Sequence, residues 1–325
     1  MPYGHCRNAC HVRGARSGPP PEGIRGWDFP DARAGARPLS FRVVTMENFR
    51  WGVIGLGLIG GSIARRLAQQ GIPVLGADRD PATRTEAQAS GVFEALLDPP
   101  ALVAAADGVI LATPVGTIEE LLEALPWRPG QLILDTGSTK RRIVAAMARL
   151  PEGVRAVGGH PMAGRERSGF LASDPELFLG KPFILVPTSR TTPEAAVQAE
   201  ELVTLLGARP IWMEAEIHDR RVAWVSHLPY VTAMALMAAV EAAGDPAMWE
   251  IAASGFRDAT RVAASDPRMM GEVVRSNADE LGAALEALCQ ILIRWREDLR
   301  ASPPVLPLEW EHLSARRRAL RFPGP

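Results

Sequence analysis

The feature that most constrains the fold is an apolar strand that runs into a glycine-rich turn and then directly into a helical pattern. The strand begins at position 51, and the turn has the spacing Gly-x-Gly-x-x-Gly. In such a turn the first glycine allows the tight bend, the second lets the backbone approach a pyrophosphate, and the third lets helix pack on strand. The N–H groups at the helix start can then bind the diphosphate. The segment therefore predicts a dinucleotide site formed by Gly55, Gly57, Leu58, Ile59 and Gly60.

A second apolar run indicates which dinucleotide is bound. Residues 73–78 follow the intervening helical pattern and end in an acid 23 residues after Gly55, close to the ~20 expected for a carboxylate that binds the ribose hydroxyls. Asp78 would repel a 2′-phosphate, so the sequence favours NAD over NADP. Arg79 beside it could instead meet a 2′-phosphate, although a solvated surface charge is the favoured interpretation of this side chain.

Length and composition fit a soluble intracellular enzyme with two packed domains. The 325 residues carry a formal charge of −1, and 47% of them are hydrophobic, which is enough apolar material for two cores. The near-neutral charge excludes a strong field for nucleic acid. No apolar run approaches the roughly 20 residues of a membrane span, and no signal peptide is evident. We therefore expect a cytoplasmic protein with no nucleic-acid or membrane partner.

The first 45 residues differ in composition from the rest of the chain. They are rich in Arg, Pro, Gly and Ala and lack a sustained apolar period, so residues 1–45 are expected to be a disordered extension or a segment upstream of the true start at Met46. A cluster of His5, Cys6, Cys10 and His11 lies here, and disorder is favoured over a metal site. We expect no metal, and three cysteines without an evident pairing indicate no disulfide framework.

From residue 50 onward, short apolar runs alternate with amphipathic stretches. This pattern predicts a parallel, doubly wound α/β sheet of the Rossmann type over residues 46–213. Ligands bind beyond the carboxyl ends of the strands of such a sheet, so polar residues that follow the apolar runs are site candidates. Thr113 and Pro114 are expected to contact the cofactor. The later candidates lie in residues 135–140 and 158–166.

After residue 213 the pattern changes to long helical segments rich in Ala and Leu, which predicts an all-helical domain over residues 214–300. Residues 231–243 are almost entirely apolar and end at Gly244, a residue suited to cap a helix. A helix that is apolar around most of its circumference must be buried. We therefore predict a homodimer formed through this domain, with residues 301–325 as a docking arm or a disordered tail.

Six motifs, in this order, resemble the prephenate dehydrogenase family of tyrosine biosynthesis, which includes arogenate and broader cyclohexadienyl dehydrogenases. The resemblance runs from about residue 49 to residue 299. The glycine turn is generic, whereas the histidine-centred and Gly-Phe-Arg-Asp motifs are specific. Without a regulatory domain or a fused mutase, the chain resembles the stand-alone form. The motifs are residues 55–62 (GLGLIGGS), 135–140 (DTGSTK), 158–164 (GGHPMAG) with Glu166 and residues 168–169, 218–220 (HDR), 226–229 (SHLP) and 255–261 (GFRDATR).

The resemblance implies an NAD-dependent oxidative decarboxylation of prephenate to 4-hydroxyphenylpyruvate. A hydride leaves the carbon that bears the ring hydroxyl, CO2 leaves the opposite ring carbon, and aromatisation drives the reaction. The protein then has to orient the substrate against the nicotinamide and take a proton from the hydroxyl. Histidine suits the second task because its unperturbed pKa is near 6.5.

The family's main residue roles transfer to motif positions of this chain. His160 is expected to bind the ring hydroxyl and accept its proton, the alternative being a structural histidine that shapes its turn. Ser138 resembles the serine that orients this histidine beside the nicotinamide, and it can also cap the following helix. Arg261 resembles the arginine that binds the substrate carboxylate, with a surface salt bridge to Asp258 as the alternative.

Further residues are expected near the substrate. Glu166 and Asp258 match acidic residues that shape the family's substrate entrance, and ordinary solvated charges are the alternative. His218 resembles a pocket residue, while His227 is as readily a buried, hydrogen-bonded structural residue. Nine residues apart on one helix, these histidines would point about 180° apart at ~100° per residue. Both could face one ligand only with a break in the helix or a contribution from a second subunit.

Tyr230 departs from the family pattern, in which many members have histidine at this position. Tyrosine still donates a hydrogen bond but carries no positive charge at neutral pH. Prephenate and arogenate therefore both remain candidate substrates, and dual specificity is a third possibility. We also expect a reduced sensitivity to feedback inhibition by tyrosine.

Two other functions share parts of this pattern. A dehydrogenase of small hydroxy acids would share the glycine turn and the helical domain, but such enzymes usually rely on a lysine in the helical region, and residues 214–299 contain none. A non-catalytic, NAD-binding dimeric module is the other alternative. The joint presence of Ser138, His160 and Arg261 argues against it, because a sensor needs no such set.

Overall fold

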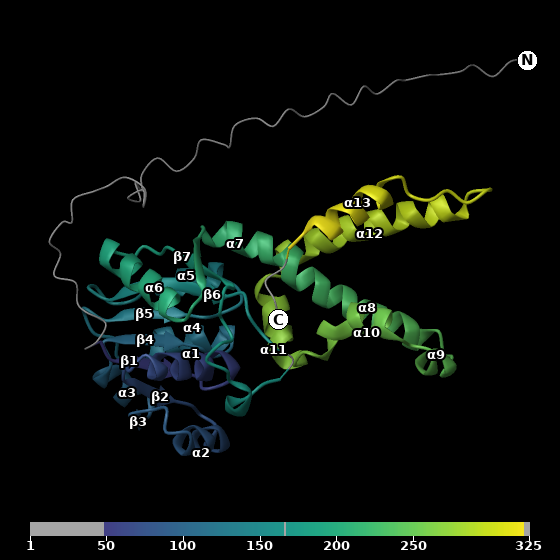
Figure 1. Ribbon diagram of the computed structural model, residues 1–325. Helices are drawn as coiled ribbons and strands as arrows, with labels where there is room; N and C mark the ends of the chain where they lie inside the picture. Colours follow the sequence, from purple (N-terminus) through teal and green to yellow (C-terminus); the bar gives the residue numbers. More distant parts are fainter. Residues whose placement is uncertain (1–48, 166, 322–325) are drawn as a thin grey trace, which may run out of the picture. The chain divides into compact units, whose positions relative to one another are not determined.

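The structure is a computed structural model that describes residues 49–165 and 167–321. The expectations for residues 1–45, for a metal at the histidine and cysteine cluster within them, and for Glu166 concern positions outside the described residues. The described chain begins with a sheet flanked by helices and continues into a set of long helices (Figure 1). This order confirms the predicted α/β fold followed by a helical domain.

The sheet has the order β3-β2-β1-β4-β5-β6-β7-β8. Its central strands are buried along their whole length, as expected for parallel strands that helices cover on both faces. This burial explains why the sequence shows continuous apolar runs here rather than alternation. The strands are β1 (Trp51–Ile54), β2 (Val74–Ala77), β3 (Ala95–Leu96), β4 (Gly108–Leu111), β5 (Leu132–Asp135), β6 (Arg155–Pro161), β7 (Pro182–Val186) and β8 (Arg209–Trp212).

Two apolar cores lie on the two faces of the sheet. On one face the sheet packs against α1 (Leu58–Gln69), α6 (Pro193–Leu205) and Ala87 of α2 (Pro81–Ala89). On the other face it packs against α3 (Pro99–Ala105), α4 (Val115–Ala124) and α5 (Arg141–Met147). Each helix supplies an apolar stripe to its core, which is the layered arrangement of a doubly wound fold.

Two strands differ from the expectation. The two-residue β3 has too short an apolar pattern to be recognised in the sequence. β7 runs antiparallel to β6, although a fully parallel sheet was predicted. Parallel neighbours need a long crossover, usually a helix, whereas the segment between β6 and β7 contains among its described residues only the three-residue 3-10 turn Phe170–Ala172. The chain therefore turns back, and α6 then makes β8 parallel to β7.

The glycine turn has the geometry that its spacing predicted. Gly55 has a φ of +93°, a conformation that side chains disfavour. A Cβ on Gly60 would overlap the backbone oxygen of Gly55, whereas a Cβ on Gly57 would meet no atom within 4 Å. Gly60 is thus required for packing, while Gly57 leaves space open at the start of α1.

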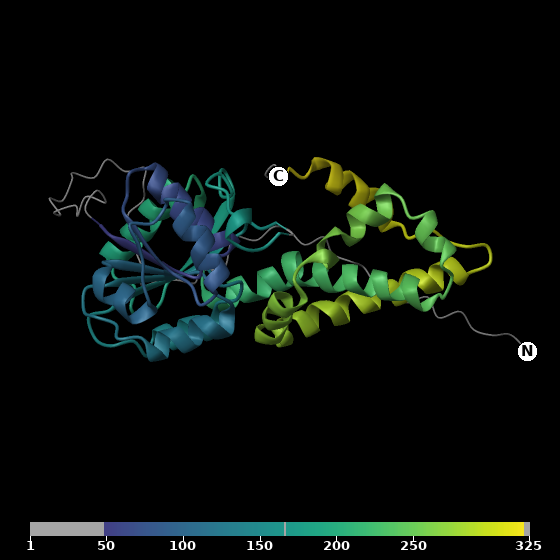
Figure 2. The same cartoon turned by 90° about the horizontal axis from the view of Figure 1, so that it is seen from below.

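The helical domain begins with a nearly continuous helical stretch, visible in Figure 2. In it, the five-residue π-helical segment Ala223–His227 joins α7 to α8. Gly244 follows α8 with a φ of +70°, as expected for a helix cap. The helices are α7 (Ala215–Val222), α8 (Leu228–Ala242), α9 (Ala247–Glu250), α10 (Ser254–Thr260), α11 (Pro267–Ser276), α12 (Ala278–Arg300) and α13 (Glu309–Ala319), with the 3-10 turn η4 (Arg261–Ala264) after α10.

The long helices leave much apolar surface uncovered in a single chain. α8 buries Tyr230 and Ala233, and α12 buries Leu281 and Ala284. Large apolar side chains elsewhere in the domain are exposed, among them Ile251 at 81%. Exposed apolar side chains in this number mark an interaction face.

One helical stretch in the described part of the chain, Ala215–Ala242, is long and apolar enough to cross a membrane by length and composition. The expectation that no apolar run reaches this length was wrong, because α7, the π segment and α8 combine into one stretch. The same test is passed by helices of soluble proteins. Here α7 buries His218 and Asp219, and Asp219 accepts hydrogen bonds from α5. The first part of the stretch is therefore committed to contacts with protein.

We expect Gly60→Ala to lower the free energy of unfolding of the cofactor-free protein by about 1–3 kcal/mol, because the added methyl overlaps a backbone oxygen. Gly57→Ala is the matched control and should change this free energy by less than about 0.5 kcal/mol. Urea unfolding of the full chain and both variants measures the difference. A Gly60→Ala protein as stable as the Gly57→Ala protein would contradict the packing argument.

Candidate active site

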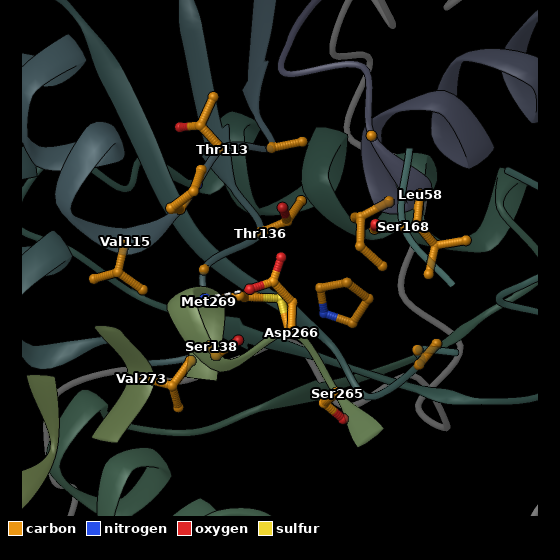
Figure 3. A pocket seen from close by; sticks show the side chains of 18 of the residues that line it. Leu58, Thr113, Val115, Thr136, Ser138, Ser168, Ser265, Asp266, Met269 and Val273 are labelled. Atoms are coloured by element: carbon orange, nitrogen blue, oxygen red, sulfur yellow. Dashed lines mark hydrogen bonds between the residues drawn. The ribbon is translucent and has the colours of Figure 1, made fainter. Parts of the chain in front are cut away.

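A cavity of about 400 Å³ lies at the carboxyl ends of β1, β4, β5 and β6, where α11 forms part of its wall. Figure 3 shows Leu58, Thr113 and Ser138 around this space together with Met269 and Val273 of α11. The carboxyl ends of parallel strands meet at one edge of the sheet, and that edge is where such folds bind ligands. The cavity therefore joins residues from both predicted domains.

Most of the predicted cofactor residues line this cavity. Gly55 and Gly60 instead form the buried turn beneath it. Thr113 Oγ1 is buried and has no hydrogen-bond partner among the described residues. A buried polar atom of this kind requires a partner, and together with the open space at Gly57 it fits a bound dinucleotide. The predicted residues that line the cavity are Gly57, Leu58, Ile59, Thr113, Pro114 and Ser138.

Asp78 lies directly after β2, at the position expected for the ribose carboxylate. Its Oδ2 accepts a hydrogen bond from the Leu56 N–H at 2.7 Å, and its Oδ1 accepts one from the Asp80 N–H at 2.9 Å. These bonds fix the carboxylate beside the glycine turn and leave further lone pairs for hydroxyl donors. Arg79 is exposed, and neither Asp78 nor Arg79 lines the cavity.

His160 lies near the end of β6 and lines the cavity. Its Nδ1 is 2.9 Å from Nε2 of His218 on α7, and His218 Nδ1 is 2.7 Å from Oδ1 of Asp219. The carboxylate requires a proton on His218 Nδ1, so His218 Nε2 is an acceptor. It accepts the Nδ1–H of His160, which leaves His160 Nε2 as a proton acceptor. The Asp219-His218 pair thus selects the tautomer in which His160 can act as a base.

Asp219 also caps α5. Its two carboxylate oxygens accept hydrogen bonds from the Lys140 N–H at 2.7 Å and the Arg141 N–H at 2.9 Å. These are N–H groups that a helix start leaves without partners. Although burial opposes it, the hydrogen bonds from His218, Arg141 and Lys140 lower the pKa of Asp219 below its ordinary value. The alternative role of Ser138 as a helix cap is not realised, since α5 has no side-chain cap from its own segment.

Burial keeps the three histidines of the site neutral. It lowers the pKa of His160 well below its ordinary value, and the neighbouring His218 and Lys140 act in the same direction. Burial also lowers the pKa of His218, partly offset by Asp219, and lowers that of His227 to about 4. Neutral imidazoles at physiological pH suit proton acceptance.

His227 belongs to the same hydrogen-bond network as His218. Its Nδ1 is 3.3 Å from the Asn277 side-chain nitrogen, which also donates to the Asp219 carbonyl oxygen at 2.7 Å. The π segment that ends at His227 widens the helix, which is the kind of break that both histidines needed to reach one site. His227 is buried, and its Nε2 has no hydrogen-bond partner in the described part of the chain.

The remaining predicted substrate residues do not line the cavity in a single chain. His218 lies behind His160 rather than on the cavity wall. Tyr230 is buried in α8. Asp258 is exposed and pairs with Arg257 at 3.1 Å, rather than appearing at an entrance. Arg261 is exposed at the start of η4, a few residues before Ser265 and Asp266 of the wall. The substrate roles of these residues remain predictions.

Sequence reasoning assigned no role to four residues that organise the site, namely Asp135, Lys140, Asp219 and Asn277. Three of them stand inside the quoted motifs DTGSTK and HDR, and Asp135 ends an apolar strand. A carboxylate at the end of a buried strand is a signal from which a role for Asp135 could have been predicted. Nothing in the sequence pairs Asn277 with Asp219, since the contact joins residues 58 positions apart.

Comparison with known proteins places both parts of the chain in one family. Residues 63–212 match the model described as prephenate dehydrogenase, nucleotide-binding domain, and residues 214–302 match prephenate dehydrogenase, dimerization domain. A cyclohexadienyl dehydrogenase of Zymomonas mobilis is 34% identical over 243 residues, which are 72% of this chain and 83% of the relative.

Two more relatives cover similar parts of the chain. A prephenate dehydrogenase of Lactococcus lactis is 36% identical over 236 residues, 70% of this chain, and the chain spans 64% of that relative's length. The crystal structure of A. aeolicus prephenate dehydrogenase in complex with hydroxyphenyl propionate and NAD+ is 28% identical with a TM-score of 0.74, covering 83% of this chain and 95% of that one.

We expect the protein to lose stability as the pH falls below about 6.5, the ordinary histidine value. Since the pKa values of His160, His218 and His227 are lowered in the folded state, the unfolded chain binds more protons there. Each histidine then lowers the free energy of unfolding by up to about 1.4 kcal/mol for each pH unit. For His227 the loss ends at about pH 4.

Thermal unfolding between pH 8 and 5 measures this slope. His227→Asn should reduce the dependence of stability on pH by the contribution of one histidine. His312→Asn, at an exposed position of α13, should leave this dependence unchanged. Equal slopes for the wild type and His227→Asn would show that His227 is not held neutral by burial.

Proposed function

We propose, from the premise that this chain belongs to the prephenate dehydrogenase family, that it catalyses the NAD-dependent oxidative decarboxylation of prephenate to 4-hydroxyphenylpyruvate. The observation that carries the proposal is His160 on the cavity wall, with Nδ1 bound to His218 and Nε2 left as an acceptor. A base of this kind beside a dinucleotide turn suits the removal of a hydride and a proton from one alcohol carbon. A module that only binds NAD has no use for it.

The residues at the glycine turn and the strand ends would hold the cofactor by its pyrophosphate and its ribose hydroxyls. The N–H groups at the start of α1 would bind the pyrophosphate, Asp78 would accept the ribose hydroxyls, and Thr113 Oγ1 would find its missing partner. The bound nicotinamide supplies the hydride acceptor. Ser138 and His160 both line the cavity, and Ser138 would lie between the nicotinamide and His160.

His160 would then act on the ring hydroxyl. As hydride leaves the hydroxyl-bearing carbon, positive charge develops on that carbon and its oxygen, and His160 Nε2 accepts the hydroxyl proton. The bond from the opposite ring carbon to the carboxylate breaks, its electron pair completes the aromatic ring, and the proton returns to the phenol oxygen. His218 and Asp219 hold the imidazole in place and stabilise the transient positive charge, as a carboxylate does behind a catalytic histidine.

NAD is favoured over NADP because the Asp78 carboxylate faces the place of the ribose. A 2′-phosphate would be repelled there, and Arg79 is an exposed side chain. Arg261 is proposed to bind a substrate carboxylate, which its planar, permanently charged group suits. Tyr230 leaves arogenate or dual specificity as the alternative to prephenate, and the similarity to a cyclohexadienyl dehydrogenase keeps that alternative open.

The uncovered faces of α8 and α12 support a homodimer. Their apolar side chains would become buried against the same faces of a second copy, and the matching family model is a dimerization domain. A symmetric pair is the commonest arrangement for such a self-complementary face. Asp258 on α10 and Arg261 on η4 lie in the same domain, and both of these elements contact α8.

The direct test is steady-state formation of reduced cofactor by the full chain with prephenate or arogenate, each paired with NAD or NADP. We expect turnover of prephenate with NAD, and a preference over NADP of at least about tenfold because of Asp78. A preference for arogenate would support the alternative substrate. NAD binding without turnover of either substrate would overturn the proposed activity and favour a binding module.

We expect Asp219→Asn to lower kcat by roughly 10²-fold or more, because the amide no longer holds His218 in the tautomer that His160 needs. Affinity for NAD, measured by fluorescence titration, should be unchanged. Asp279→Asn is the matched control, since Asp279 also binds Arg141 but is exposed and does not touch His218. Similar losses of kcat in both variants would show that Asp219 acts only through Arg141.

A further inference from the structure

The chain contains only two lysines among its 36 basic residues, and one of them is completely buried beneath the site. Lys140 Nζ makes a short ion pair with Asp135 and donates to the Gly159 carbonyl oxygen at 2.6 Å, and both side chains of the pair have no exposed surface. The lysine stem passes Gly158, where a Cβ would lie 3.5 Å from Lys140 Cδ, an ordinary van der Waals contact. A compact ammonium fits this space, whereas a planar guanidinium is bulkier.

Asp135 connects the pair to the two backbone segments that carry the catalytic candidates. Its Oδ2 accepts the Gly137 N–H at 2.8 Å, directly before Ser138. Its Oδ1 accepts the Gly159 N–H at 3.0 Å, directly before His160. One carboxylate therefore sets the distance between the serine turn and the histidine strand.

Lys140 connects the pair to the third part of the site. Its backbone N–H donates to Asp219 Oδ1 at 2.7 Å, the oxygen that also binds His218. The side chain of Lys140 thus holds Gly159 on one side, while its backbone holds the Asp219-His218 pair on the other. No other described ion pair has both side chains buried and also contacts all three segments.

We propose that the buried Asp135–Lys140 ion pair is a positioning element of the reaction. It fixes Ser138, His160 and the Asp219-His218 pair in one arrangement, and it places the Lys140 ammonium against the Gly159 carbonyl oxygen, directly before His160, where its charge keeps His160 ready to accept a proton. This inference rests on the proposed function for its kinetic part. Its geometric and electrostatic parts are properties of the folded chain.

The free-energy cost of burying two charges supports a positioning role for the Asp135–Lys140 pair. Two buried charges lose their hydration, and replacing a buried pair by apolar groups is often neutral or stabilising. Stability alone is therefore a weak reason for such a pair. Beyond stability, the side chains of the pair supply three hydrogen bonds to the backbone of Gly137 and Gly159, directly before Ser138 and His160, and a charge at a defined position.

Several charged groups besides Lys140 lie near His160. Lys140 lies among the groups that lower the pKa of His160, together with His218 and His227, after burial itself. Asp135 and Asp219 act in the opposite direction on His218. The other charged groups around the cavity are Arg165, Arg167, Asp266 and Glu272. Of these, Arg165 pairs with Asp174, Asp266 caps α11, and Glu272 accepts the Gly116 N–H.

The test is a double variant, Asp135→Asn with Lys140→Met, because a single change would leave one charge buried and unpaired. We expect NAD binding to be retained, kcat to fall by roughly 10- to 100-fold from misplacement, and KM to change much less. The acid limb of the kcat/KM profile should move to higher pH, since Lys140 lowers the pKa of His160 whereas Asp135 is not among the groups that shift it. Lys181→Met, at the only other lysine, should change neither kcat nor the limb.

Wild-type kcat, or an acid limb at the wild-type pH, in a folded double variant would overturn the proposal. If the full wild-type chain turns over neither substrate, the proposed function has failed, and histidine-ring NMR titration decides the inference without substrate. The His160 signal should then titrate at higher pH in the double variant, and an unmoved titration would overturn the inference.

If the double variant does not fold, the wild-type chain provides the test. Labelling of lysine with 15N gives two side-chain signals, assigned through Lys181→Met. The Lys140 signal should be that of a protonated ammonium protected from exchange throughout the pH range of NAD binding. A neutral amine, or an ammonium in fast exchange with water, would overturn the proposal.

Discussion

The two oxygens of Asp219 hold together the start of α5 and the imidazole of His218, and the arrangement of the site depends on them. Without this carboxylate, α5 would lose its cap and His218 would lose the group that fixes its tautomer. The capped helix α5 belongs to the sheet domain, whereas Asp219 and His218 belong to the helical domain. One side chain therefore couples the position of the helical domain to the protonation pattern of His160.

The interior around this carboxylate is polar, and hydrogen bonds and burial determine which of its groups are charged. Asp219 stays ionised because several N–H groups donate to it. The histidines stay neutral because burial penalises the imidazolium. The ion pair of Asp135 and Lys140 is neutral as a whole, and it places the Lys140 ammonium against the Gly159 carbonyl oxygen beside His160. These conditions together give a buried base with an open nitrogen, a combination that an apolar or fully solvated site could not provide.

The helical domain contributes to the site and carries an apolar surface at the same time. α11 closes the cavity with Met269 and Val273, while α8 and α12 expose apolar side chains along most of their length. The exposed surface is not needed for the contacts of α7 and α11 with the sheet domain. Its composition instead supports the proposed pairing of two chains, which would leave each nucleotide-binding domain free to bind its cofactor.

The sequence by itself determined the local structure, because glycine spacing, apolar runs and helix stops act over a few residues. The turn at Gly55 and Gly60, the strand ends that carry Ser138 and His160, and the stop at Gly244 all follow from such short-range rules. Only the tertiary structure decided the reversed β7, the burial of Lys140 and the chain of contacts from Asp219 to His160. Those outcomes depend on hydrogen bonds and packing between residues tens of positions apart, and a linear pattern does not encode which buried polar groups will meet.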